Sequence, residues 1–160
     1  MNAIQMLVKQ HRQMEAAFTT VLKAEGEARA TLWAEAADAL MAHVLVEEQH
    51  FYPAVRAKRT EDVLLESLEE HLSLKRVMAD LLALPIDDPR FEPKLHVLKE
   101  QAEHHHEEEE EKLFPKATKL LDAADLEALG ELMQAAQEKL LAGHPRERAR
   151  QQTAAAAELK

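Results

Sequence analysis

Cysteine is absent from the 160 residues of this chain. Disulfides, thiolate metal ligands and cysteine nucleophiles are therefore excluded, and any bound metal must be held by nitrogen and oxygen atoms. Glycine, proline and aromatic residues are also scarce, and the remainder is rich in Ala, Leu, Glu, Lys and Gln, which favour helices. A chain of this length commonly builds one domain around one core. The composition predicts an all-α protein.

Positive charge and long apolar runs are lacking as well. The formal net charge is -10, which argues against binding to nucleic-acid phosphates or to an anionic membrane surface. No apolar run approaches the roughly 18 residues that cross a bilayer. The first residues, MNAIQMLVKQH, lack the charged, apolar and small-residue order of a secretory signal. We expect a cytoplasmic protein with no nucleic-acid or membrane partner.

Five segments carry apolar residues at the spacing of one helical face, and breakers separate them. They span residues 2–23, 27–58, 60–81, 93–120 and 122–143. Thr60 is a plausible N-cap, and Gly143 with Pro145 ends the fifth segment. Short connections favour antiparallel neighbours. The pattern predicts an up-down-up-down four-helix bundle over residues 1–121, a further helix packed on it over 122–143, and a flexible tail over 144–160.

The first two predicted helices repeat in the next two. The segment HVLVEEQHFYP, residues 43–53, aligns without a gap on HHEEEEEKLFP, residues 105–115. The repeated pairs lie 60 or 62 residues apart: His11 and His71, His43 and His105, Glu47 and Glu109, Pro53 and Pro115. Such a repeat predicts a bundle with a pseudo-two-fold axis, near which equivalent residues meet.

Each half contains a histidine followed four residues later by a glutamate, and this spacing places both side chains on one helical face. In both copies the pair continues the apolar stripe, so six polar side chains point into the predicted core. Buried without partners these groups would be destabilising, whereas a pair of dications would stabilise them. Imidazole and carboxylate ligands suit iron or manganese, and zinc less exclusively. The two glutamates are placed to bridge two metals about 3.5 to 4 Å apart.

These motifs resemble the hemerythrin-like domain, also called the HHE cation-binding domain, over roughly residues 1–120. The shared pattern is His11, HVLVEEQHFYP, His71 and HHEEEEEKLFP. The resemblance implies an antiparallel four-helix bundle with a non-haem di-iron centre that meets dioxygen, nitric oxide or peroxide, or that senses or supplies iron. It assigns terminal ligands to His11, His43, His71 and His105, and bridging ligands to Glu47 and Glu109.

One position departs from the oxygen-carrying hemerythrins. These have an extra histidine one turn after the third-helix ligand, and this chain has Lys75 there. We therefore expect one iron to have one protein ligand fewer, which favours small-molecule chemistry or sensing over reversible oxygen carriage. The lack of cysteine also removes the amino-terminal cysteine module of iron-repair relatives.

Other polar residues near the motif allow more than one role. A ferritin-like pattern, Glu-x-x-His, also occurs at Glu47 with His50 and at Glu103 with His106, but these pairs break the repeat. His50 either orients Glu47 or lies at the rim, and the remaining histidines are interpreted as hydrated-face residues. Glu48 and Glu110 either bond ligand histidines or face solvent. Tyr52 faces either the site or the surface, and Pro53 and Pro115 are expected to kink or end their helices just past the metal turn. The rim and hydrated-face set comprises His50, His96, His104, His106 and His144.

The expected function is that of a di-iron protein that binds or reduces a small diatomic ligand or peroxide, with a redox partner or a second copy of the chain as possible partners. Two alternatives stay open at this stage. One is an iron store, sensor or donor, and the other is a structural bundle with zinc or no metal. If the protein is an enzyme, it is a di-iron oxidoreductase in which manganese or zinc can replace iron.

Overall fold

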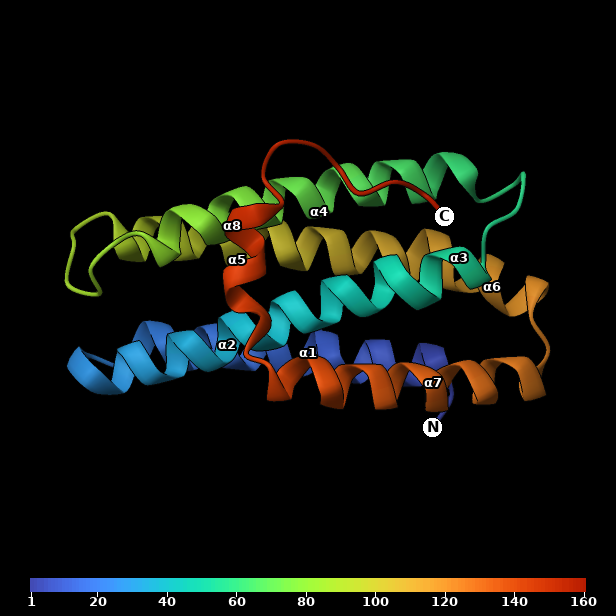
Figure 1. Ribbon diagram of the computed structural model, residues 1–160, viewed down its shortest axis with the longest axis horizontal. Helices are drawn as coiled ribbons and strands as arrows, with labels where there is room; N and C mark the ends of the chain where they lie inside the picture. Colours follow the sequence, from blue (N-terminus) through green and yellow to red (C-terminus); the bar gives the residue numbers. More distant parts are fainter.

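The computed structural model describes all residues from 1 to 160 and contains only helices and connecting segments, which confirms the predicted all-α class (Figure 1). The long helices are α1 (Ala3–Lys23), α2 (Gly26–Val46), α4 (Glu61–Leu82), α5 (Phe91–Glu108) and α7 (Ala123–Ala142). Shorter elements are the π-helices η1 (Glu47–Phe51) and η2 (Glu109–Leu113), the helices α3 (Tyr52–Ala54), α6 (Phe114–Leu120) and α8 (Arg148–Gln151), and the 3-10 helix η3 (Pro145–Glu147).

Local sequence signals set the ends of these helices. Asn2 and Gln5 form a reciprocal capping box at the start of α1. The Asp122 side chain caps α7 by accepting a hydrogen bond from the backbone of Asp125 at 2.8 Å. Thr60 precedes α4 as predicted, but its hydroxyl donates to the Val55 carbonyl instead of capping the helix. The second predicted segment ends four residues beyond α3, and the fourth begins two residues after the start of α5.

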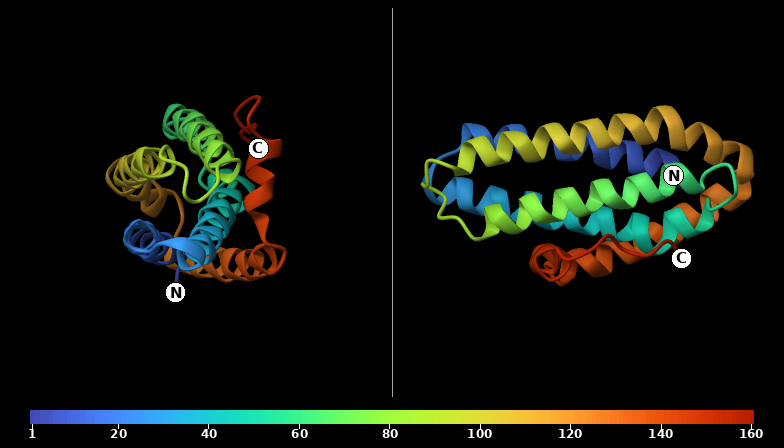
Figure 2. Two further views of the ribbon diagram at one scale, coloured as in Figure 1. Left: turned by 90° about the vertical axis from the view of Figure 1, so that its left-hand side faces the viewer. Right: turned by 90° about the horizontal axis from the view of Figure 1, so that it is seen from above.

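The helices α1, α2, α4 and α5 form the antiparallel bundle, and α7 lies outside it along α1 and α2. The view along the bundle axis in Figure 2 shows α7 covering one side of the four helices. None of the helices is both long and apolar enough to span a membrane. The apolar core is divided into two clusters, one around Phe18, Leu40 and Met78 and the other around Leu7, Phe51 and Phe114. A layer of buried polar residues lies along the same helices between these clusters.

Both halves of the repeat contain a π-helical turn at the same place. In each turn a backbone N–H reaches back five residues, from Tyr52 to the Glu47 carbonyl and from Phe114 to the Glu109 carbonyl. A proline follows immediately in each case. The predicted disturbance near Pro53 and Pro115 thus takes the form of a π turn that begins at the glutamate itself, and π turns often occur at functional sites.

The carboxyl-terminal residues differ from the flexible tail expected over 144–160. Residues 145–151 form two short helices, and Ala149 is fully buried. The buried Asp38 carboxylate of α2 holds this segment by accepting hydrogen bonds from the backbone and guanidinium of Arg146. Beyond α8 the chain returns along α4 (Figure 1), where the Arg76 guanidinium donates to the Thr153 carbonyl. These polar contacts hold the segment without an apolar stripe, which is why the sequence pattern did not reveal its position.

The close contact between α7 and the start of α1 depends on Gly130. A Cβ at this position would lie 2.5 Å from the Met1 carbonyl oxygen and 2.8 Å from the Ala3 nitrogen. Gly130→Ala gains about 0.5–1 kcal/mol of helix propensity but forces a backbone shift that costs about 1–3 kcal/mol. We expect a lower thermal midpoint for this variant. Gly143→Ala, whose nearest contact is 3.5 Å, is the control, and a Gly130→Ala protein more stable than wild type would contradict the packing.

Candidate metal centre

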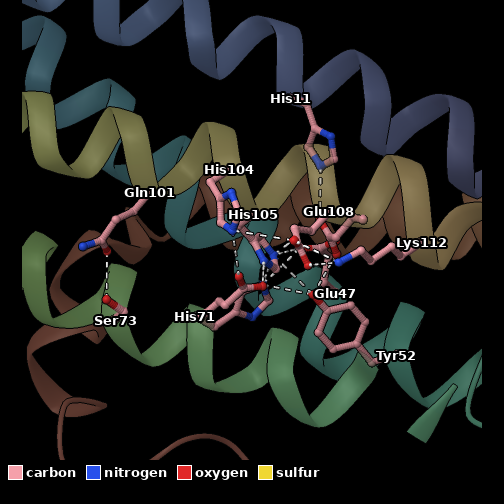
Figure 3. A network of polar contacts seen from close by, with 12 residues as sticks. His11, Glu47, Tyr52, His71, Ser73, Gln101, His104, His105, Glu108 and Lys112 are labelled. Atoms are coloured by element: carbon pink, nitrogen blue, oxygen red, sulfur yellow. Dashed lines mark hydrogen bonds and ion pairs between the residues drawn. The ribbon is translucent and has the colours of Figure 1, made fainter. Parts of the chain in front are cut away.

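The six side chains predicted as ligands meet in the polar layer at the middle of the bundle, and each is at most 1% exposed. Figure 3 shows His11, His71 and His105 pointing from three different helices toward the group of carboxylates that includes Glu47. The contacts of their Nε2 atoms with the two central carboxylates are His43 to Glu47 at 3.1 Å, His71 to Glu47 at 3.3 Å, His11 to Glu109 at 3.4 Å and His105 to Glu109 at 3.4 Å. The structure thus brings together the residues that the repeat singled out.

The donor atoms form two overlapping groups. One atom each from His11, His43, Glu47 and Glu109 lies within 4.8 Å of the others. A second group of the same compactness joins Glu47 to His71 and His105. Glu47 belongs to both groups, which is the arrangement expected of a carboxylate shared by two metal positions. Glu109 is not part of the second group, but its carboxylate lies 3.4 Å from Nε2 of His105.

Each of these four histidines has an acceptor for its other ring nitrogen. The four Nδ1 partners are Glu110 for His11 (2.8 Å), Gln10 for His43 (2.8 Å), Glu48 for His71 (2.9 Å) and Glu70 for His105 (2.9 Å). An ionised carboxylate or an amide oxygen can only accept a hydrogen bond, so Nδ1 carries the proton in each ring. The Nε2 lone pair then faces the centre, as metal-ligating histidines require.

These acceptors follow the internal repeat. The residues just before His11 and His71, namely Gln10 and Glu70, bond the histidine of the other helix in the same half. Glu48, which follows Glu47, bonds His71 of the second half, and Glu110, which follows Glu109, bonds His11 of the first half. For Glu48 and Glu110 the structure decides between the two roles left open by the sequence. Gln10 and Glu70 were missed because no motif marks them, although their shared place before a ligand histidine is a signal.

Lys75 occupies the position at which carrier hemerythrins have a further histidine. Its side chain is buried, and its Nζ donates to both oxygens of Glu48 at 3.0 and 2.9 Å. Burial alone would raise the pKa of Glu48, but its hydrogen bond to His71 and the charge of Lys75 lower it. The ammonium group is therefore directed at the carboxylate behind His71.

Burial and mutual repulsion perturb the titration of the central groups. Burial lowers the pKa of His43 far below its ordinary value of 6.5, and it lowers that of His71. Burial also acts to lower the pKa of His105, but the charges of Glu109 and Glu70 outweigh it and raise that pKa. The pKa of Glu47 is raised well above 4.5 by burial and by the adjacent charge of Glu109. Without metal, His105 and Glu47 therefore keep their protons to a higher pH than the free side chains do.

Tyr52 faces the centre, which settles the choice that the sequence left open. Its hydroxyl donates to Glu109 Oε2 at 2.8 Å and lies 3.1 Å from the Nε2 atom of His71 (Figure 3). Its ring stacks on His71, with centroids 5.4 Å apart. Burial and the nearby carboxylates raise the pKa of Tyr52 well above 10, so the phenol stays protonated and acts as a hydrogen-bond donor.

The interpretation of His106 as a hydrated-face residue is wrong. Its side chain is buried, with a residue exposure of 1%, because it points from α5 toward α1 and stacks on His11. The neighbouring His104 has a side chain 66% exposed and does face solvent, where it lies near Glu70 and Glu108. Of the other histidines assigned to the surface, His96 and His144 are exposed, and His50 is half-buried.

The chemistry of the centre fits a pair of hard or borderline cations. Several buried atoms have no hydrogen-bond partner. Without a bound cation, each of them would lower the free energy of unfolding by about 1–3 kcal/mol. These atoms are Nε2 of His11 and His43, both oxygens of Glu47, Oε1 of Glu109 and both ring nitrogens of His106. In addition, the Nε2 atoms of His71 and His105 lie 3.0 Å apart, where two lone pairs would repel each other unless a proton or a metal lay between them.

A family model described as the hemerythrin HHE cation binding domain matches residues 2–117. This chain belongs to that family. The HHE match covers the bundle and ends near the close of α6, so α7 and α8 lie outside it. The six residues predicted as ligands all lie inside it.

A solved structure is similar over nearly the whole chain. It is a hemerythrin HHE cation binding domain-containing protein from Mycobacterium kansasii, with a TM-score of 0.81 and 26% identical residues. The match covers 96% of this chain and 94% of that chain, so the elements beyond the HHE match also have counterparts there. No curated protein matches this chain.

Proton release should accompany metal binding to this HHE centre. His105 and Glu47 have raised pKa values and so keep their protons to a higher pH than usual, and a bound cation displaces these protons, whereas the lowered pKa values of His43 and His71 favour their neutral forms. The affinity for metal should therefore rise with pH up to the raised pKa values, by about tenfold per pH unit for each proton released. Calorimetric titration of the metal-free protein in buffers of different ionisation enthalpy measures this release. An affinity that does not change with pH, or a titration that releases no proton, would contradict the protonation assignment.

Proposed function

We propose that this chain is a non-haem di-iron protein that binds or reacts with a small ligand such as dioxygen, nitric oxide or peroxide. His11 and His43 hold one iron, His71 and His105 hold the other, and Glu47 and Glu109 bridge the two. Donors of nitrogen and oxygen without sulfur, in a buried layer, support iron, and manganese or zinc fits the same atoms less selectively. Bound iron supplies ligand positions and electrons, while the protein supplies a dry, hydrogen-bonded surrounding.

The observation that carries the proposal is the hydroxyl of Tyr52. It lies 2.8 Å from Glu109 Oε2, 3.1 Å from Nε2 of His71 and 3.5 Å from Nε2 of His105. A purely structural metal site needs no hydroxyl hydrogen-bond donor among its ligand atoms. A protonated phenol at this place can donate to a small ligand bound beside it, or deliver a proton to that ligand, while water is excluded by the two apolar clusters.

Metal analysis and absorption spectra of protein loaded with iron(II) without oxygen test the proposal. We expect two irons per chain and a change in the visible spectrum when oxygen, peroxide or nitric oxide is added. Chelation should lower the thermal midpoint, because metal bound only by the folded state adds to its stability.

His71→Ala should bind less metal and keep its helices, since it loses a ligand but no helix. His104→Ala, at an exposed histidine of the same bundle, is its matched control. Iron that exchanges freely and gives no spectral response to any of the three ligands would contradict the proposal and favour storage or supply of iron. A thermal midpoint that chelator leaves unchanged would argue against the metal site.

Removing the Tyr52 hydroxyl should separate metal binding from reactivity. Tyr52→Phe keeps the ring that stacks on His71 and removes the donor to Glu109. A hydrogen bond to a charged group contributes about 1.5–3 kcal/mol, so we expect ligand affinity or reaction rate to fall by tenfold or more.

Iron content is the internal control for this variant and should stay unchanged, because the ligand set is intact. Stopped-flow absorption measures the reaction. A Tyr52→Phe protein that reacts at the wild-type rate would leave the hydroxyl without a functional role.

A further inference from the structure

His106 has surroundings unlike those of an ordinary buried histidine. It is 1% exposed, its ring lies parallel to that of His11 with centroids 3.9 Å apart, and it meets the ring of His43 edge-on at 5.4 Å. Neither of its ring nitrogens has a hydrogen-bond partner. A neutral imidazole always carries one N–H donor and one acceptor, so burying both without partners is destabilising by about 1–3 kcal/mol for each atom.

The nitrogen atoms of three rings converge at this place. One nitrogen each from His11, His43 and His106 lies within 4.8 Å of the other two. The three rings come from three different helices, α1, α2 and α5. Parallel stacking of two rings does not prevent both from directing a nitrogen at one ion, because each lone pair lies in the plane of its own ring.

The internal repeat shows that a histidine is not needed here for packing. The residue equivalent to His106 in the first half, 62 residues earlier, is Val44, which is buried in the apolar cluster. An aliphatic side chain therefore suffices at the matching place, where no third imidazole approaches His71 and His105. The difference between the halves adds a nitrogen donor to one end of the centre only.

The other end of the centre has no such addition. Lys75 directs its ammonium to Glu48 and offers no lone pair, and the neighbour of His71 and His105 is the protonated hydroxyl of Tyr52. The donor sets at the two ends are thus unequal, with three imidazoles at the His11 end and two at the His71 end.

We propose that His106 is a third imidazole ligand of the metal held by His11 and His43, and that small ligands therefore bind at the other metal, beside Tyr52. The inference rests on the proposed di-metal function and deepens it. A metal with three imidazoles and two bridging carboxylates has few positions left, whereas the metal of His71 and His105 keeps positions that open toward a hydrogen-bond donor. Lys75 leaves the His71 end without an extra histidine, and His106 supplies one at the His11 end instead.

Two substitutions distinguish ligation from packing. His106→Phe keeps a flat ring against His11 and removes both nitrogens, and His106→Val copies the residue of the other half. His104→Phe, at the adjacent exposed position, is the matched control. We expect the control to bind two metals like wild type. Both His106 variants should bind one metal at least about 100-fold more weakly, since even groups that only orient a ligand contribute about 10- to 100-fold to metal affinity.

Mössbauer spectra of iron-loaded protein provide a readout that packing alone would not move. Wild type should show two different iron environments, of which nitric oxide changes one. The His106 variants, loaded at saturating iron, should show a change in the environment that nitric oxide leaves untouched in wild type. Circular dichroism of the metal-free variants checks folding, and the valine variant decides the result should phenylalanine be too large for the site.

Two outcomes overturn the inference in distinguishable ways. If wild type binds two metals and both His106 variants do so with equal affinity and unchanged spectra, His106 packs against His11 and is no ligand, while the proposed function stands. If wild type itself binds no metal, the proposed function fails and this assignment fails with it.

Discussion

Everything in this bundle is organised around two carboxylates, Glu47 and Glu109, that are buried where no protein donor satisfies most of their oxygen atoms. Burial of like charges at such close range is unfavourable unless protons or cations lie between them. In their neutral form the four surrounding imidazoles do not relieve this, because their Nδ1 protons already serve outer acceptors and their Nε2 lone pairs face inward. The centre is therefore complete only with added positive charge, and the family to which the chain belongs is one of cation-binding domains.

The outer acceptors tie this centre to the rest of the fold. Each of the four inward-facing histidines is fixed by a residue on another helix, so the orientation of the rings depends on the packing of all four bundle helices. Charges behind these acceptors extend the network further, with Lys75 against Glu48 and Arg12 against Glu110. A ring that is held on its far side loses less freedom when it binds a metal, which is the physical benefit of such preorganisation.

Sequence reasoning predicted the bundle and the convergence of six side chains because both depend on regular helical spacing and on an internal repeat. It could not place Tyr52, and regular spacing shows why. Tyr52 follows His43 by nine residues, which at 3.6 residues per turn is two and a half turns and puts it on the opposite face. The π turn between them contains one extra residue and rotates the later part of the helix by about 100 degrees, toward the centre.

The misplacement of His106 had a different cause. Its position, next to a ligand histidine and within a run of glutamates, is typical of a solvated helix face, and a single amphipathic stripe assigns it outward. In the structure α5 contacts α1 on one side and α4 on the other, so two adjacent faces of one helix are buried. Gln10 and Glu70 could not be recognised for a related reason, since the contacts that give them a role cross between helices and leave no local pattern.

The tandem arrangement has a consequence for how such a centre can become specialised. Two separate hairpins of identical sequence, associated as a homodimer, would carry the same residue at every equivalent position and so would enclose two equal metal environments. Joining the halves in one polypeptide removes that restriction. Three equivalent positions of the two halves differ here, namely Tyr52 and Phe114, Val44 and His106, and Gln10 and Glu70. Covalent duplication thus allows the two ends of one buried polar layer to carry different side chains.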